Sequence, residues 1–265
     1  MPNTPAKRKP SASPVQIVPL TELPEIVPGN DLAAMIVEAS KKQRLVPARG
    51  DAFVIAQKIV SKAEGRMVRL DTIAPSARAR QWAAEYHKDA RVVELVLREA
   101  SSIVRMERGV IIARTRHGFV CANAGVDISN VPEGMAALLP ENPDRSAAAL
   151  QQQLARAFGV HAGVIISDTF GRPWREGLVN VALGVAGLAP LLDLRGRRDA
   201  HGKLLQATVI ALADELAAAA GLVMGKSDRV PVAVVRGMAV PAGKGSGQDL
   251  IRPLATDLFR ERPTS

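Results

Sequence analysis

The chain has 265 residues, 47% hydrophobic and 23% charged, a composition that excludes general disorder and leaves enough chain for a substantial core. Its single cysteine, Cys121, excludes an intrachain disulfide and any metal site built from several cysteines, and it favours a reducing, cytoplasmic setting. The formal net charge is +9, but aromatic residues make up only 3% of the chain and no basic stripe is visible, so small anionic ligands are favoured over nucleic acid.

The N-terminal part of the chain predicts a tail followed by alternating elements. Residues 1–14 include Lys7, Arg8 and Lys9 and no acidic residue, so we expect a flexible basic tail ahead of a domain over residues 15–265. This tail has no apolar stretch of signal-peptide length and does not predict a secretory leader. Strand is predicted at 16–20 and 51–60, and a helix at 31–42 with Asn30 or Asp31 as N-cap.

The rest of the chain continues this alternation without an internal repeat. Helices are predicted at 76–86, 89–100, 146–158 and 202–221, and strands at 102–106, 109–115, 118–121, 162–167 and 230–236. The turn-rich segment 130–144 marks a candidate boundary between two lobes. The apolar stretch 177–194 contains Asn180, Pro190 and Asp193, which favours buried core over a membrane span. These elements predict an α/β or α+β fold with a mixed sheet.

Two segments place polar residues and small residues beside predicted strands. In QKIVSKAEG (57–65), Lys62 follows a strand end and is suited to a phosphate, although a solvated surface lysine explains the pattern equally well. In CANAGVDISN (121–130), Asp127 lies among small residues and two asparagines, which leaves room for a ligand; a loop that satisfies its own backbone is the alternative.

The segment ISDTFGRPWREG (166–177) predicts a metal–phosphate site most directly. Asp168 and Thr169 follow a predicted buried strand and offer hard oxygen ligands for Mg²⁺ or Mn²⁺. Arg172 and Arg175 are candidates for contacts with a transferring phosphoryl group or a substrate carboxylate, because an Arg fork suits both. Trp174 is expected to pack in the interior.

A fourth segment, MGKSDR (224–229), contains a Gly-Lys-Ser sequence but does not predict a P-loop. Only three residues separate Gly221 from Gly225, where the motif needs four, and the segment follows a predicted helix instead of opening one. The four histidines lack zinc-binding spacing, and no GxSxG motif is present. Cys121 is expected to be a small buried residue rather than a nucleophile.

Taken together, these segments give the chain a family resemblance that extends from Val18 to Arg236. Its motifs are QKIVSKAEGR (57–66), HGFVCANAGVDISNV (117–131), LLPENPD (138–144), VIISDTFGRPWREG (164–177), RGRRDAHG (195–202) and PVAVVRG (231–237). With these motifs in this order, the chain resembles the coenzyme F-420 gamma-glutamyl ligase family. The resemblance implies a two-lobed, homodimeric ligase that uses GTP and Mg²⁺ or Mn²⁺, with a monovalent cation as a further candidate. It implies that L-glutamate is joined to a deazaflavin precursor through an acyl phosphate, with further gamma-linked additions.

The same resemblance implies roles for individual residues. It identifies Asp127 and Asp168 as metal ligands and Thr169 as a metal contact. The nucleotide contacts that it implies are Leu23, Pro24, Glu25, Ile26, Gln57, Lys58, Lys62, Asn130, Met224, Gly225, Lys226, Ser227, Asp228, Arg229 and Val230. Where Lys226 stands, some members of the family have Gln or Glu able to bind a second metal; an ammonium has no acceptor, so a second metal is not predicted here.

The resemblance also predicts a stand-alone ligase, because the chain ends at Ser265 without the fused flavin-binding domain of some relatives. Two alternatives stay open from the sequence. One is another metal- and GTP-dependent carboxylate–amine ligase on the same scaffold, because fold does not fix substrate. The other is a basic nucleotide- or RNA-binding protein, against which the paired aspartates argue.

Overall fold

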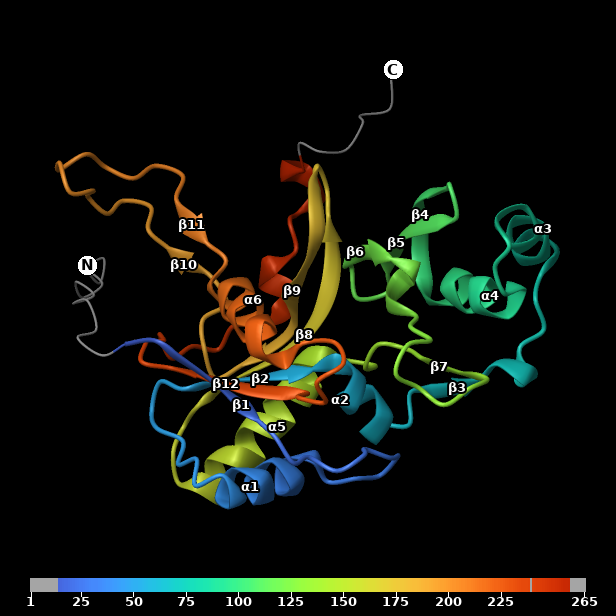
Figure 1. Ribbon diagram of the computed structural model, residues 1–265. Helices are drawn as coiled ribbons and strands as arrows, with labels where there is room; N and C mark the ends of the chain where they lie inside the picture. Colours follow the sequence, from blue (N-terminus) through green and yellow to red (C-terminus); the bar gives the residue numbers. More distant parts are fainter. Residues whose placement is uncertain (1–13, 239, 258–265) are drawn as a thin grey trace.

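A five-stranded mixed sheet forms the centre of the molecule (Figure 1). The computed structural model describes residues 14–238 and 240–257. In spatial order the strands are β1 (Gln16–Leu20), β12 (Val232–Arg236), β2 (Ala52–Ala56), β8 (Gly163–Arg172) and β9 (Arg175–Ala186). Only the β2–β8 pair among them is parallel, and the other neighbours are antiparallel. The predicted mixed α/β architecture is therefore confirmed.

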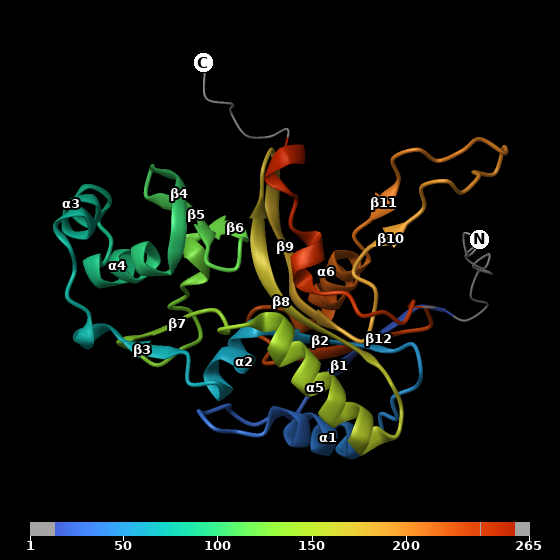
Figure 2. The same cartoon turned by 180° about the vertical axis from the view of Figure 1, so that it is seen from behind.

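Helices cover both faces of this sheet, because β2 alternates its side chains between two apolar clusters. Phe53 and Ile55 pack with helices α1 (Leu32–Lys42) and α5 (Pro143–Phe158) on one face. Ala52 and Val54 pack with helix α6 (Leu212–Met224) on the other. Figure 2 shows α1 and α5 side by side below the sheet. This two-sided burial explains the near-continuous apolar sequence of the strand.

The segment between α2 (Gln57–Ala63) and α5 forms a separate hydrophobic cluster beside the sheet (Figures 1 and 2). It contains α3 (Ala77–Tyr86), α4 (Ala90–Glu99) and an antiparallel meander of β4 (Ala100–Glu107), β5 (Val110–Thr115) and β6 (Val120–Ala122). The chain leaves through β3 (Met67–Arg69) and returns through β7 (Met135–Ala137), which pair with each other. Asp127 lies on this return path and is thereby brought back toward the sheet.

A two-stranded arm, β10 (Leu192–Asp193) and β11 (Val209–Ile210), projects on the side opposite to α3 and α4 (Figure 1). Four short 3-10 helices complete the described part: η1 (Leu70–Thr72), η2 (Asn123–Gly125), η3 (Gly247–Leu250) and η4 (Leu254–Thr256). No helix in the described residues is long and apolar enough to cross a membrane. The predicted basic tail falls almost wholly on residues 1–13, which lie outside the described part.

Most predicted elements are confirmed, with N-caps Asp31, Ser76 and Asp89 accepting hydrogen bonds from the first turns of their helices. The strand predicted over 51–60 is wrong in its second half, because helix α2 begins at Gln57. On one side of β2, the neighbour β12 pairs no further than Ile55. Without a partner there, the apolar run continues as a helix that buries Ile59 and Val60.

Three other predictions need correction. The helix predicted over 202–221 begins only at Leu212, because the backbone of residues 199–208 pairs across the arm, for example Leu205 N to Arg197 O. The stretch 177–194 is not all core, since Leu178 is 67% exposed near the tip of the β8–β9 hairpin. Trp174, expected to pack inside, is 80% exposed at the same tip.

Candidate functional site

A pocket of about 770 Å³ opens at the carboxyl end of β2, where Ala56 pairs with Ser167 of the parallel strand β8. Such a crevice at the carboxyl end of parallel strands is a common ligand position in α/β proteins. Five chain segments, together with α2 and the residue before it, line it: Leu23, Pro24, Glu25, Ile26, Ala56, Gln57, Lys58, Ile59, Lys62, Asp127, Asn130, Val131, Pro132, Ser167, Asp168, Thr169, Asn180, Met224, Gly225, Lys226, Ser227, Arg229, Val230 and Pro231. The structure thus brings together every metal and nucleotide candidate named from the sequence except Asp228.

The two aspartates experience different environments in this pocket. Burial opposes ionisation of Asp127, but hydrogen bonds from Lys58 Nζ (2.7 Å) and Ser129 N (2.7 Å) outweigh it and lower its pKa. Burial raises the pKa of Asp168 to about 6, although the Thr169 N–H and the charge of Lys226 partly oppose this rise. Both carboxylates are therefore largely ionised at pH 7 to 8, and Asp168 is the more weakly compensated of the two.

Lysines from separate elements neutralise this part of the pocket. Lys58, on α2, also donates from Nζ to Ser129 O at 2.6 Å. Lys226, in the loop after α6, donates from Nζ to Thr169 Oγ1 at 2.7 Å, and Thr169 Oγ1 donates in turn to Asn180 Oδ1 at 2.8 Å. Lys62 pairs with Glu25 at the pocket edge, with a side chain only 13% exposed. That burial contradicts the interpretation of Lys62 as a solvated surface lysine.

Two polar lining residues were missed from the sequence, Ser167 and Asn180. Ser167 is 2% exposed, and its Oγ has no hydrogen-bond partner in the described part of the chain. A buried hydroxyl without a partner is costly unless a ligand or water satisfies it. A serine before an Asp-Thr pair gives no distinctive sequence signal, and Asn180 lies on β9, within the stretch interpreted as core.

The oxygen atoms of this pocket fit a divalent cation that shares its ligands with a bound substrate. Two carboxylates, the Thr169 hydroxyl and the unpartnered Ser167 hydroxyl are hard donors of the kind that Mg²⁺ and Mn²⁺ prefer. Within the described residues, no three His, Cys, Asp or Glu side chains gather into a metal-binding group. Complete coordination would therefore require further oxygen atoms, and Mg²⁺ commonly takes these from phosphates and water.

The loop after α6 supports the exclusion of a P-loop. Met224 ends the helix, and Gly225 follows with φ 58° and ψ −166°, a conformation essentially restricted to glycine. The Gly-Lys-Ser sequence thus leaves a helix instead of opening one. Across the pocket, Asn130 Nδ2 donates to Lys226 O at 3.3 Å and joins this loop to the Asp127 segment.

Arg172 and Arg175 lie outside this pocket. Strand β8 continues past Asp168 to the hairpin tip, where Arg172 Nη2 donates to Glu176 O at 2.5 Å. At about 3.3 Å per residue, the four steps from Asp168 to Arg172 extend about 13 Å along the strand. No local pattern of residues indicates that the strand continues so far, and the structure does not bring these arginines into the pocket with the carboxylates.

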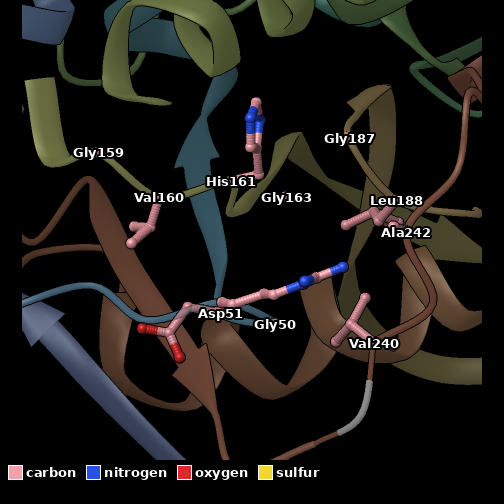
Figure 3. A pocket seen from close by; sticks show the side chains of 11 residues that line it. Gly50, Asp51, Gly159, Val160, His161, Gly163, Gly187, Leu188, Val240 and Ala242 are labelled. Carbon is pink, nitrogen blue, oxygen red and sulfur yellow. The ribbon is translucent and has the colours of Figure 1, made fainter. Parts of the chain in front are cut away.

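A second hollow, of about 620 Å³, lies at the other end of the parallel strands (Figure 3). Asp51, directly before β2, and Gly163, the first residue of β8, line it together with Arg49 and His161. Asp51 Oδ2 is already occupied by Arg236 Nη2 at 2.6 Å. This hollow lacks the paired carboxylates of the first pocket, which is therefore the candidate active site.

Comparison with known proteins agrees with this geometry. The sequence profile of the family described as F420-0:Gamma-glutamyl ligase matches residues 21–237, a range that includes every segment lining the pocket. The chain belongs to this family. The resemblance stated from the motifs is thereby confirmed.

Several curated members of the family are similar over almost their whole length. The chain is 46% identical to the coenzyme F420:L-glutamate ligase of Methanothermobacter thermautotrophicus, over 93% of this chain and 99% of that protein. It is 47% identical to the protein of the same name from Methanocaldococcus jannaschii, over 80% of this chain and 85% of the relative. The corresponding Archaeoglobus fulgidus protein is 40% identical, over 93% and 96% of the two chains.

Proposed function

We propose that this protein is a GTP-dependent ligase that joins L-glutamate to the deazaflavin precursor of coenzyme F-420 and then adds further gamma-linked glutamates. The observation that carries the proposal is the meeting of Asp127, Asp168 and Thr169 with three lysines in one pocket of a chain from this family. Anionic and cationic side chains side by side suit a metal–nucleotide complex, because the carboxylates hold the metal and the lysines hold phosphate oxygens.

Each group of lining residues has a distinct task in this proposal. Asp127 and Asp168 would hold Mg²⁺ or Mn²⁺, with Thr169 and Ser167 as further oxygen donors. When bound, the metal would neutralise negative charge on the transferring phosphoryl group. Lys62, Lys226 and Arg229 would bind phosphate oxygens. The turn from Leu23 to Ile26 supplies the less polar wall for the base.

The reaction that these residues would support has two steps. In the first, an oxygen of the acceptor carboxylate forms a bond to the γ-phosphorus of GTP, the bond to the β-phosphate oxygen breaks, and GDP leaves. In the second, the amine nitrogen of glutamate attacks the acyl carbon, inorganic phosphate leaves and the amine loses a proton.

The test is a mass measurement on the acceptor. Purified protein is incubated with the unglutamylated deazaflavin, L-glutamate, GTP and Mg²⁺ or Mn²⁺, and the products are separated by chromatography. We expect a mass gain of one or more glutamyl units that disappears when GTP or the metal is omitted. Formation of GDP only with some other carboxylic acid would move the proposal to another carboxylate–amine ligase. Steeply salt-dependent RNA binding without GTP consumption would refute a ligase function.

The finer features of the assembly belong to the same proposal. We propose a homodimer, a division into two lobes near residues 130–144 and a cytoplasmic setting, as the family resemblance implies. Light scattering coupled to size-exclusion chromatography tests the dimer directly, because a mass of 28.1 kDa would show a monomer.

A further inference from the structure

Two ammonium groups lie where the proposed metal site needs a cation. Lys58 Nζ is 2.7 Å from Asp127 Oδ2, and Lys226 Nζ is 2.7 Å from Thr169 Oγ1. The two lysines come from different elements, Lys58 from α2 and Lys226 from the loop after α6. Each ammonium thus occupies an oxygen atom that a divalent cation would use.

An ammonium and a divalent cation compete for such an oxygen. Mg²⁺ binds oxygen at about 2.1 Å, so a metal on Thr169 Oγ1 or Asp127 Oδ2 would lie within a few ångströms of the ammonium. At that separation two positive charges repel strongly in a partly buried site. The two carboxylates and two ammonium groups also cancel in formal charge, so the cluster as a whole has no excess negative charge with which to attract a free cation.

We propose that Lys58 and Lys226 are positioning residues that hold this site against free divalent cations and move to the phosphates when nucleotide binds. The inference rests on the proposed function, because it requires an oligophosphate ligand. Phosphate oxygens give both ammonium groups new partners and bring the negative charge that the neutral cluster lacks. Asp127 and Thr169 are then released to the metal, so the metal enters together with the nucleotide.

A thermodynamic consequence follows from this exchange. Nucleotide must increase the affinity of the site for metal, and metal must increase its affinity for nucleotide by the same factor. The lysines carry this coupling, so removing one ammonium raises the affinity for metal in the absence of nucleotide. A residue that only stabilised the loop would not have that effect.

The experiment measures Mn²⁺ binding to the metal-free protein by electron paramagnetic resonance of the free ion, first without nucleotide. The variants are Lys226→Met and Lys58→Met, which keep the aliphatic stem but add no metal ligand, and Lys203→Met as a control on the exposed arm. We expect Lys226→Met to bind Mn²⁺ about tenfold or more tightly than the unmodified protein. Lys203→Met should match the unmodified protein. Circular dichroism melting verifies that each variant folds. If Lys226→Met does not fold, Lys58→Met provides an independent test.

A second titration includes GDP, with Mn²⁺ bound by GDP alone measured without protein. We expect GDP to strengthen Mn²⁺ binding to the unmodified protein, and the difference from Lys226→Met to become smaller. Equal Mn²⁺ affinities of the unmodified protein and both methionine variants without nucleotide would overturn the inference, as would tight Mn²⁺ binding that GDP does not change. Failure of the proposed function is distinguishable, because it appears as absence of glutamyl transfer in the mass measurement and leaves the Mn²⁺ titrations interpretable.

Discussion

The half-buried, poorly solvated carboxylate of Asp168 lowers the stability of the folded protein, so replacing it by a neutral side chain should stabilise the fold. Burial raises the pKa of Asp168 from 3.8 to about 6, so the folded protein binds this proton more tightly than the unfolded chain. One pKa unit corresponds to about 1.4 kcal/mol, so ionised Asp168 lowers the free energy of unfolding by about 3 kcal/mol. We therefore expect Asp168→Asn to be more stable than the unmodified protein at pH 8 while losing metal-dependent activity.

The sign of the effect fixes its pH dependence. Below pH 3.8 the aspartate is protonated in both states and the two proteins should be equally stable. Between pH 3.8 and about 6 the advantage of the asparagine variant should grow, and above that range it should be constant. A gain of about 3 kcal/mol corresponds to a rise in Tm of about 6 °C for a chain of this size.

Thermal unfolding in the presence of a chelator, followed by circular dichroism at several pH values, measures this difference. Glu38→Gln on the exposed face of α1 is the matched control and should change neither Tm nor activity. An Asp168→Asn protein that melts at or below the temperature of the unmodified protein at pH 8 would refute the reasoning. It would show that the carboxylate is satisfied by groups other than the metal that we propose.

Three further predictions follow from the site. Lys62→Ala should weaken GDP binding about tenfold in calorimetry, because a largely buried ammonium is lost from the pocket wall; unchanged affinity would remove Lys62 from the nucleotide contacts. Gly225→Ala should destabilise the loop after α6 by about 1–3 kcal/mol and reduce turnover, since φ is 58° and a Cβ would collide with Asp228; a normal Tm would contradict this strain. Cys121 should not react with a thiol reagent at pH 8 until the protein unfolds, because burial, with a smaller contribution from Asp168, raises its pKa to about 12; rapid modification of the native protein would contradict the burial.

The sequence by itself determined the elements whose causes are local. The helices predicted from residues 31, 76 and 89 begin there, capped by Asp31, Ser76 and Asp89, because a side-chain oxygen and the next turn suffice to define such a start. The buried strands also followed from composition, since runs such as Ala52–Ala56 are apolar on both faces. The site segments could be named in advance because their residue types and motifs are distinctive within each segment.

The tertiary structure alone decided which of these segments meet and how each run ends. Gln57 begins a helix because β12 provides no further partner beside β2, and residues 202–211 form part of an arm because their backbone pairs with residues before them. Arg172 was expected beside Asp168 but follows the strand to the hairpin tip, whereas Lys58 reaches Asp127 across 69 residues of sequence. Strand pairing and side-chain contacts between distant segments set these distances, and a local pattern of residues does not contain that information.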